Sequence, residues 1–337
     1  MASPHDDEEA GLLDTGTVVG YLSRRGSLPD GPVRAEMLGG GVSNVVLAAG
    51  GGERAVVVKQ ALGRLRVAEE WYAPEERAMI EADALEFVGR ITPGRVPRVI
   101  DRDARRHTLT IARAPAGWQD WKTLLLQGRA DPTVAAELGV TLGSWHRRTT
   151  GVALPGPLEG TEHFEQLRLS PYYRNVAQKA PELSGRVLGL ADQLLVRRVC
   201  LVHGDFSPKN VLVGPGGPWV IDFEVAHRGD PAFDVAFLLC HLTLKSLHLP
   251  EKAAGFDACA AEFIRAYQAA AGRPEPRLPY VLEHVGCLLL ARVKGKSPAE
   301  YLTPSERAAA WRLGMDLLEA PAATLEQLRD RRDGAAR

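Results

Sequence analysis

The stretch that decides the fold is VHGDFSPKNVLV, residues 202–213. An apolar run leads into His-Gly-Asp, an asparagine follows Asp205 five positions later, and an apolar run resumes after Asn210. This pattern predicts strand, tight loop and strand, with a carboxylate and an amide presented from one loop. Phosphoryl transfer needs such a pair, because the Asp orients the attacking hydroxyl and the Asn oxygen helps to hold Mg²⁺. A plain β-hairpin with Asp and Asn as turn formers is the alternative.

A second group of acids follows in WVIDFEVAHRGDPAFDVA, residues 219–236. Asp222 ends an apolar strand, where a carboxylate is costly unless it meets a cation, so we expect it to hold Mg²⁺ beside Asn210. Glu224 lies two residues on and would point to the same side of an extended chain. Asp234 opens an apolar helix and is expected to be its N-cap, although a tie to the backbone of the His-Gly-Asp loop would also fit.

Together, H-G-D-x-x-x-x-N, I-D-F-E and G-D-P-x-x-D resemble the aminoglycoside phosphotransferase superfamily, which also contains choline kinases and methylthioribose kinases. The resemblance covers roughly residues 30 to 310. It implies an α+β, bilobal protein-kinase-like fold, with a small β-rich N-terminal lobe that has one main helix and a larger, mostly helical C-terminal lobe. It implies ATP and Mg²⁺ as cofactors and a hydroxyl group of a small molecule as the phosphate acceptor. The implied roles are Asp205 as the catalytic residue, Asn210, Asp222 and Glu224 as metal ligands, and His203 as a brace of the loop.

The resemblance also makes demands on the N-terminal lobe. A lysine should close a β run and reach the nucleotide phosphates, and Lys59 closes the apolar run at 56–58. A glutamate on the following helix should pair with it. On the helix expected from Pro74 to about Val88, Glu81 borders the apolar stripe and is the first choice, with Glu76 as the second. A surface strand lysine and a solvated helix acid are the alternatives.

Three glycines precede a strand in LGGGVSNVV, residues 38–46. Glycine lets a backbone approach phosphate oxygens closely and exposes N–H donors. The loop looks like the G-x-S-N form of the superfamily, although a plain β-turn is possible. At the connector near residue 113, which resembles the hinge of the fold, adenine would bond to main-chain groups. The expected ATP-binding residues are therefore Gly39, Gly40, Gly41, Ser43, Asn44, Lys59, Ala112 and Ala114.

Changes of pattern along the chain predict four segments: a flexible acidic tail at 1–14, a nucleotide-binding lobe at 15–112, a hinge at 113–118 and a catalytic and substrate lobe at 119–330. Short β runs dominate the first lobe and long helical patterns the second. The expected strands are 45–49, 55–58, 96–100 and 108–111, and the expected helices include 132–149, 181–198 and 256–271.

Composition excludes several classes of protein. The 337 residues carry 41 basic and 42 acidic side chains, a net charge of −1, which argues against a nucleic-acid binder. No apolar run reaches the ~18 residues that span a bilayer, and the start lacks the pattern of a signal peptide, so we expect no membrane association. Four separated cysteines without CxxC spacing fit a reducing, cytoplasmic location.

The acceptor is the least determined feature. LLLARVKGKSP, residues 288–298, ends a helix with three cations. It predicts a pocket for an anionic or hydroxyl-rich acceptor with Arg292 as a substrate contact, or else only favourable charge at a helix C-terminus. Polycationic aminoglycosides would be repelled, which favours a neutral or anionic hydroxyl compound such as a sugar or sugar derivative. The general class of expected acceptors also includes amino alcohols. The alternatives are a methylthioribose kinase, which residues 58–62 resemble, an aminoglycoside-modifying phosphotransferase and a non-catalytic nucleotide-binding module.

Overall fold

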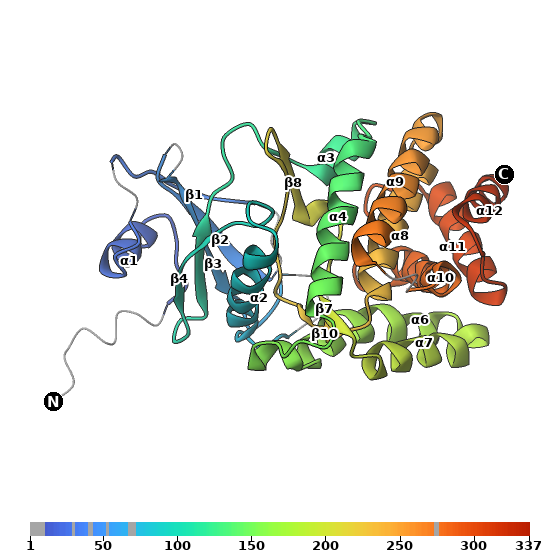
Figure 1. The fold of residues 1–337 in the computed structure, drawn as a ribbon, viewed down its shortest axis with the longest axis horizontal. Helices are drawn as coiled ribbons and strands as arrows, with labels where there is room; N and C mark the ends of the chain where they lie inside the picture. The colour runs from blue at the N-terminus through green and yellow to red at the C-terminus, as the bar shows by residue number, and fades with distance from the viewer. Residues whose placement is uncertain (1–10, 29–30, 40–42, 52–53, 67–71, 273–275) are drawn as a thin grey trace.

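A five-stranded antiparallel sheet in the order β1-β2-β3-β5-β4 forms the N-terminal part of the computed structural model (Figure 1). The structure describes residues 11–28, 31–39, 43–51, 54–66, 72–272 and 276–337. The expectations placed on residues 1–10, Gly40 and Gly41 lie outside these ranges. The elements of this part are α1 (Val18–Arg24), β1 (Ala35–Met37), β2 (Asn44–Ala49), β3 (Val56–Ala61), α2 (Arg77–Ile91), β4 (Val99–Asp103) and β5 (Thr108–Ala112).

Alternate residues of β3 point to opposite faces of this sheet. Val56 and Val58 of β3 pack in a cluster with α1, whereas Val57 and Lys59 line the cleft below the sheet. The strand expected at 96–100 forms three residues later, at Val99–Asp103. Pro97 explains the shift, because it has no N–H to donate to a ladder.

Helices make up most of the C-terminal part, on the right in Figure 1. The α-helices are α3 (Trp121–Leu126), α4 (Pro132–Thr149), α5 (Glu162–Phe164), α6 (Asn175–Lys179), α7 (Ser184–Val196), α8 (Ala232–His248), α9 (Ala253–Ala271), α10 (Leu278–Lys294), α11 (Pro304–Glu319) and α12 (Leu325–Ala336). A π-helix, η3, spans Glu165–Arg174. Short strands complete this part: β6 (Gln119–Asp120), β7 (Cys200–Val202), β8 (Val211–Gly214), β9 (Gly217–Val220) and β10 (His227–Gly229).

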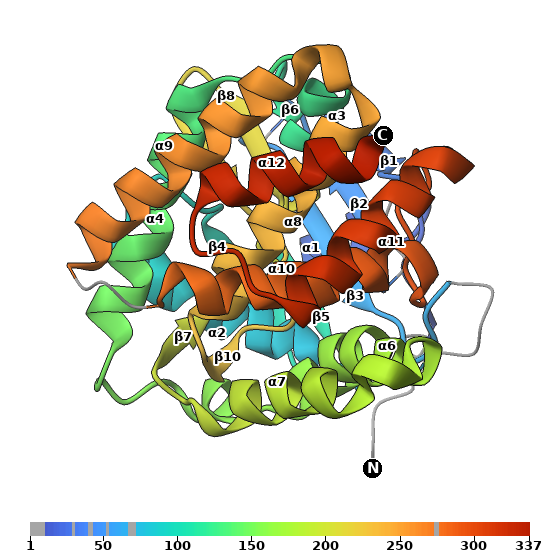
Figure 2. The same cartoon turned by 90° about the vertical axis from the view of Figure 1, so that its right-hand side faces the viewer.

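Helix α8 is the centre of the C-terminal part, with α9, α10, α11 and α12 packed around it (Figure 2). Its residues from Ala232 to Leu247 are all buried. Helices α4 and α9 approach each other closely at two glycines. A Cβ added to Gly139 would lie 2.5 Å from the carbonyl oxygen of Phe263, and one added to Gly143 would lie 2.6 Å from that of Tyr267. This packing fixes α4, which lies next to α2 of the N-terminal part.

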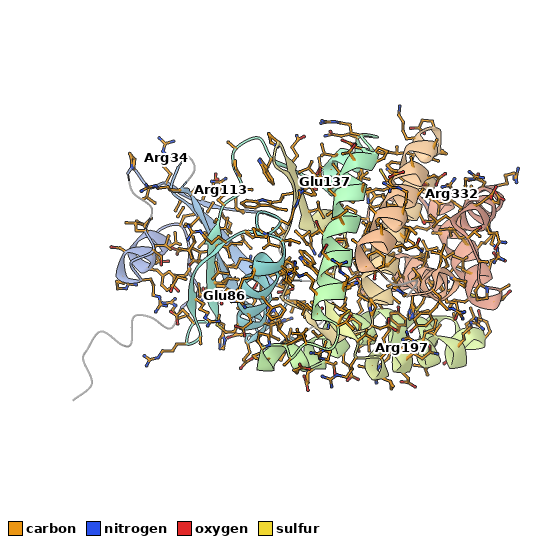
Figure 3. All side chains as sticks on the ribbon, in the orientation of Figure 1. Arg34, Glu86, Arg113, Glu137, Arg197 and Arg332 are labelled. Atoms are coloured by element: carbon orange, nitrogen blue, oxygen red, sulfur yellow. The ribbon has the colours of Figure 1, made fainter. Side chains whose placement is uncertain are left out.

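The two parts are joined by polar contacts as well as by the chain. Arg95, between α2 and β4, forms a 2.6 Å ion pair with Glu137, and the carbonyl of Arg95 accepts from the N–H of Val220. Glu137 lies on α4 (Figure 3). The four cysteines are free and buried, at Cys200, Cys240, Cys259 and Cys287. Within the described ranges, no single helix is long and apolar enough to cross a membrane, while α8 with residues 250–271 would pass as a bent pair by length and composition only.

Candidate active site

The loop after β7 is not the turn of a hairpin. Strand β7 pairs with β10, and β8 pairs with β6 and β9, so residues 203–210 pass from one small sheet to another. Gly204 has a φ of +78°, and a Cβ there would lie 2.6 Å from the carbonyl oxygen of Val225. Only glycine accommodates both the left-handed backbone and this close approach.

Asp234 fixes the backbone of this loop. Its fully buried carboxylate accepts from the N–H of His203 at 2.7 Å and from the N–H of Gly204 at 2.9 Å. The expectation of an N-cap is wrong, because α8 has Pro231 at its N-cap and Asp234 sits inside the first turn. The tie to the loop backbone is the role that the structure gives it.

His203 lies against the segment that follows β9 and carries Asp222. Its Nδ1 accepts from the N–H of Asp205 at 3.1 Å, so the proton on Nε2 donates to the carbonyl of Ile221, also at 3.1 Å. Burial lowers the pKa of His203, although the charges of Asp234 and Asp205 oppose this. A neutral imidazole with both nitrogens engaged braces the loop.

Asp205 is buried and surrounded by donors. Its Oδ2 lies 2.9 Å from Arg168, 3.0 Å from Lys209 and 2.8 Å from the Nδ2 of Asn210. Burial alone would raise the pKa of Asp205, but the charges of Arg168 and Lys209 outweigh it and lower the pKa. Sequence reasoning missed Arg168, which comes from the π-helix η3 and also donates to the carbonyl of Gly204. No local pattern marks it, because its partners lie 36 and 37 positions away.

Lys59 joins the two parts of the molecule. Its Nζ lies 2.8 and 2.6 Å from the two carboxylate oxygens of Glu81 on α2 and 2.6 Å from Asp222. Burial disfavours the charge on Lys59, but Asp222 and Glu81 outweigh this and raise its pKa. Burial would raise the pKa of Asp222, but Lys59 and Lys209 lower it. The ammonium group of Lys59 thus forms ion pairs with two carboxylates. Glu76, the second choice for this role, makes none of these contacts.

Glu224 does not share the surroundings of Asp222, contrary to the extended-chain expectation. Asp222 has a φ of +72°, so the chain is not extended there, and the two carboxylates have different hydrogen-bond partners although both line one cleft. Glu224 accepts from the Nε of Arg77 at 3.2 Å and from the Nδ2 of Asn44 at 3.0 Å. Arg77 is fully buried, and its other nitrogens donate to the carbonyls of Ser43, Leu62, Ala73 and Pro74. Arg77 therefore ties the glycine loop to the C-terminal part, a role that the sequence analysis did not assign.

Of the three residues expected to hold Mg²⁺, Asn210 and Asp222 fit that ion. The Nδ2 of Asn210 donates to the carbonyl and the carboxylate of Asp205, which leaves its Oδ1 as an acceptor. The Ile221 N–H donates to the Asn210 carbonyl at 2.9 Å, which places Asp222 alongside. Among the described residues no group of three or more His, Cys, Asp or Glu side chains is arranged to hold a metal. An amide and a carboxylate suit Mg²⁺, which usually takes one or two carboxylates together with substrate phosphates and waters.

A cleft of about 1510 Å³ is lined by Lys59, Glu81, Asn210, Asp222 and Glu224. Asp205 lies behind its wall, held by Arg168, Lys209 and Asn210, which do line it. Gly39, Ser43, Asn44, Ala112 and Ala114 all line it. The N–H of Ala112 already donates to the carbonyl of Arg98 at 2.8 Å, so a nucleobase must use other main-chain groups of the connector. Of the tryptophans that follow, Trp118 lines the cleft and meets Trp219 edge to face, with ring centroids 5.0 Å apart, whereas Trp121 belongs to the core.

The three cations at the end of α10 separate in the structure. Arg292 contacts Tyr172 and Ser297, and Lys294 lies over the ring of Trp311 with its Nζ 3.9 Å from the centroid. Lys296 lines the cleft. The segment is thus more than a set of solvated charges at a helix end.

The fold and the cleft define a bilobal, kinase-like phosphotransferase architecture, and comparison with solved structures agrees. Amicoumacin kinase, solved in complex with AMP-PNP, Ca²⁺ and Ami, matches with a TM-score of 0.54 and 17% identity over 96% of this chain and 99% of that one. Spectinomycin phosphotransferase, solved with ADP and spectinomycin, matches with a TM-score of 0.52 and 13% identity over 95% and 94%.

Residues 34–280, well over half of the chain, match the model of the phosphotransferase enzyme family, and the chain belongs to that family. Among curated proteins, a methylthioribose kinase of Bacillus cereus is 26% identical over 263 residues, and one of Bacillus mycoides is 25% identical over 260. These alignments cover 70% and 69% of this chain. They span 65% of the length of each relative.

Proposed function

We propose that this protein transfers the γ-phosphate of Mg²⁺·ATP to a hydroxyl of a small molecule. The observation that carries the proposal is the buried Asp205 carboxylate, held by Arg168, Lys209 and Asn210 beside the Lys59–Asp222 pair. A phosphotransferase needs an acid near the acceptor hydroxyl and a cation near the phosphates, and the two groups meet here around one cleft.

Each residue of the site has a separate task in this proposal. Lys59, fixed by Glu81, contacts the nucleotide phosphates, and the loop from Gly39 to Asn44 covers them. Asn210 and Asp222 hold Mg²⁺, which offsets the charge of the phosphates when bound. Asp205 orients the acceptor hydroxyl and accepts its proton late, which suits a carboxylate whose pKa is lowered.

The acceptor is proposed to be neutral or anionic, such as a sugar or sugar derivative. Arg168, Lys209 and Lys296 lie on the C-terminal side of the cleft, where an acceptor would reach Asp205. A polycation such as an aminoglycoside would meet like charge there. The curated relatives favour methylthioribose as one candidate acceptor, and Arg292 is the proposed substrate contact.

The test is a screen for acceptor-dependent release of ADP with sugars, sugar derivatives, amino alcohols and aminoglycosides. We expect turnover with at least one neutral or anionic member and poor turnover with kanamycin-type compounds. Asp205→Ala should lower kcat on the order of 10²-fold or more with little change in ATP affinity. Parent-level turnover in a folded Asp205→Ala protein would refute the role. ATP binding without turnover in any arm would favour a non-catalytic module.

The metal assignment has its own test. Asp222→Asn removes a formal charge from the proposed Mg²⁺ site, so Mg²⁺-dependent nucleotide binding should weaken, and Asn210→Ala should weaken it less. Glu224→Gln tests whether that acid contributes, because its pairing with Arg77 would give a structural effect without a change in metal affinity. Unchanged Mg²⁺·ATP binding by Asp222→Asn would rule out the assignment.

A further inference from the structure

Among the described residues, two hydrogen-bond donors near the acceptor side of the cleft have no acceptor, and a third has only a distant one. The Nε of Arg292 and the Oη of Tyr301 are buried and have no hydrogen-bond partner. The Nζ of Lys245 has only a long contact, 3.4 Å, to the carbonyl of His241 on its own helix. Lys245 is fully buried on α8. Buried charges and donors of this kind are normally paired, because leaving them unpaired is costly.

These three side chains lie together. The Nζ of Lys245 lies 5.5 Å from the centroid of the Tyr301 ring. Burial lowers the pKa of Lys245 to about 7, with Arg292 and Lys122 as the next causes, so Arg292 is close enough to act on it. Asp120 raises the pKa of Lys245. Its carboxylate, however, caps α3 by accepting from the N–H of Thr123 at 2.8 Å. The group therefore has an excess of positive charge.

The group also reaches the wall of the cleft. The Nη1 of Arg292 donates to the carbonyl and the hydroxyl of Ser297 and lies 3.5 Å from the Oη of Tyr172. Ser297 and Tyr172 both line the cleft. Tyr172 follows Arg168, the partner of Asp205, by four positions in η3, which is on the order of one helical turn. The donors are thus connected to the proposed catalytic carboxylate through Tyr172 and Arg168 of the same helix.

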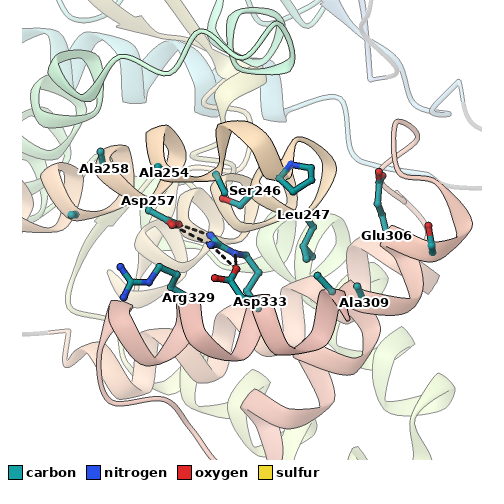
Figure 4. Close-up of a pocket in the computed structure, with 15 residues that line it drawn as sticks. Ser246, Leu247, Ala254, Asp257, Ala258, Glu306, Ala309, Arg329 and Asp333 are labelled. Carbon is teal, nitrogen blue, oxygen red and sulfur yellow. Dashed lines mark hydrogen bonds and ion pairs between the residues drawn. The ribbon is translucent and has the colours of Figure 1, made fainter.

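A second cavity, of about 890 Å³ between α8, α9, α11 and α12, shows how this chain treats another buried arginine (Figure 4). Arg332 on α12 bonds both carboxylate oxygens of Asp257, at 3.1 Å for the longer contact, and lies 2.8 Å from Asp333. Arg292 has no such carboxylate within the part of the chain that the structure describes. The contrast indicates that its acceptor comes from outside the chain.

We infer that Arg292, Lys245 and Tyr301 form an anion site that takes the charged group, a carboxylate or a phosphate, of the acceptor. The inference rests on the proposed function and narrows its acceptor to hydroxyl compounds that carry an anionic group. The free Nε of Arg292 belongs to a planar fork that can bond two oxygens of such a group, and Lys245 adds a point charge. The hydroxyl at the other end of the molecule then reaches Asp205.

The experiment uses matched pairs of acceptors with the full chain and Mg²⁺·ATP. The carboxylate arm compares glucose with gluconate and glycerol with glycerate, and the phosphate arm compares ribose with ribose 5-phosphate. In at least one arm we expect kcat/KM for the anionic member to exceed that of its neutral partner by about 10- to 100-fold, the range for hydrogen bonds to charged groups. The arm that responds identifies the anion.

Two variants test the residues, and one serves as control. Arg292→Gln should reduce the anionic-to-neutral ratio of kcat/KM towards one, through a higher acceptor KM with little change in the ATP KM. Lys294→Gln, on the same helix but stacked on Trp311, should keep the parent ratio. Lys245→Met removes a buried cation that lacks a carboxylate, so without ligand its Tm should rise. The stabilisation of the parent by the preferred anionic acceptor, or by inorganic phosphate alone, should be lost in this variant.

The outcomes separate this inference from the proposed function. Equal or better use of the neutral members by the parent overturns the anion site and leaves phosphoryl transfer standing. Absence of ADP release with every acceptor, together with no Mg²⁺·ATP-dependent rise in Tm, overturns the proposed function. In that case the anion site is still supported if inorganic phosphate raises the Tm of the parent. Neither Lys245→Met nor Arg292→Gln should then show this rise. No rise in the parent, or an equal rise in the variants, overturns the anion site.

Discussion

Asp234→Asn is the change that best separates the position of the catalytic loop from its chemistry. The parent carboxylate accepts two short bonds from the loop backbone while remaining fully buried. Asparagine has almost the same shape, but only one of its two polar atoms accepts. One loop N–H therefore keeps its acceptor, and the other faces an NH₂ group.

The magnitude follows from these contacts. A hydrogen bond to a charged group contributes about 1.5–3 kcal/mol, and a buried donor left without an acceptor costs about 1–3 kcal/mol. We expect the free energy of unfolding to fall by roughly 2–4 kcal/mol, which lowers the Tm by roughly 4–8 °C at about 2 °C per kcal/mol for a large domain. A misplacement of about 1 Å in the loop that carries Asp205 would lower kcat on the order of 10²-fold. The KM for ATP should change little.

Asp230→Asn is the matched control. Asp230 is equally buried and precedes the same helix, but its carboxylate accepts from Ala232 and Tyr280 and pairs with Arg197, away from the loop. The Asp230→Asn substitution should lower the free energy of unfolding by a similar amount without lowering kcat. Thermal denaturation and initial rates with the best acceptor measure both variants. Parent kcat in Asp234→Asn, or an equal fall of kcat in both variants, would refute the positioning argument.

Three further predictions concern other parts of the molecule. Arg77→Met breaks a buried ion pair and should cost about 3–5 kcal/mol and raise the KM for ATP, with Arg77→Lys recovering part of both losses in the same assays. Gly139→Ala forces a methyl group against the backbone of α9 and should cost at least about 1–3 kcal/mol in chemical denaturation, whereas Gly189→Ala on α7, with open space around it, should stabilise slightly. The folded chain holds Lys245 at a pKa of about 7 and the unfolded chain at about 10.4, so between these pH values the unfolded state binds more protons and stability should rise with pH. The difference in unfolding free energy between the parent and Lys245→Met should therefore shrink from pH 7 to pH 9, and a constant difference would contradict the assignment.

The sequence was most informative where chemistry is concentrated in a few consecutive residues. The motif around Asp205 and Asn210, with the later Asp222, carries the resemblance to a known superfamily, and that resemblance implied the kinase-like fold. The resemblance also called for a lysine and a glutamate in the N-terminal lobe. Local patterns pointed to Lys59 and Glu81 as candidates, and the structure brings them into contact.

What the sequence left undetermined depends on tertiary packing. Arg168 donates to Gly204, 36 positions away, and Arg77 pairs with Glu224, 147 positions away, and neither arginine lies in a recognisable motif. Asp234 was expected at a helix N-cap because local pattern cannot show which N–H groups the fold brings near. The departure of Glu224 and Asp222 from the extended-chain expectation follows from a single left-handed residue, which side-chain alternation does not predict.

The placement of the cysteines gives the protein a property useful for measurement. All four lie in the C-terminal part, on β7, α8, α9 and α10, and each is buried. Burial raises the pKa of Cys240 and of Cys259 to about 12, so neither thiol offers a thiolate at neutral pH. A thiol reagent should therefore modify the native chain only when this helical part opens, and its rate of reaction reports that opening directly. A single cysteine introduced on the exposed edge of β1 would react at once. It would allow a fluorophore to follow movement between the sheet and the helices without removal of any native cysteine.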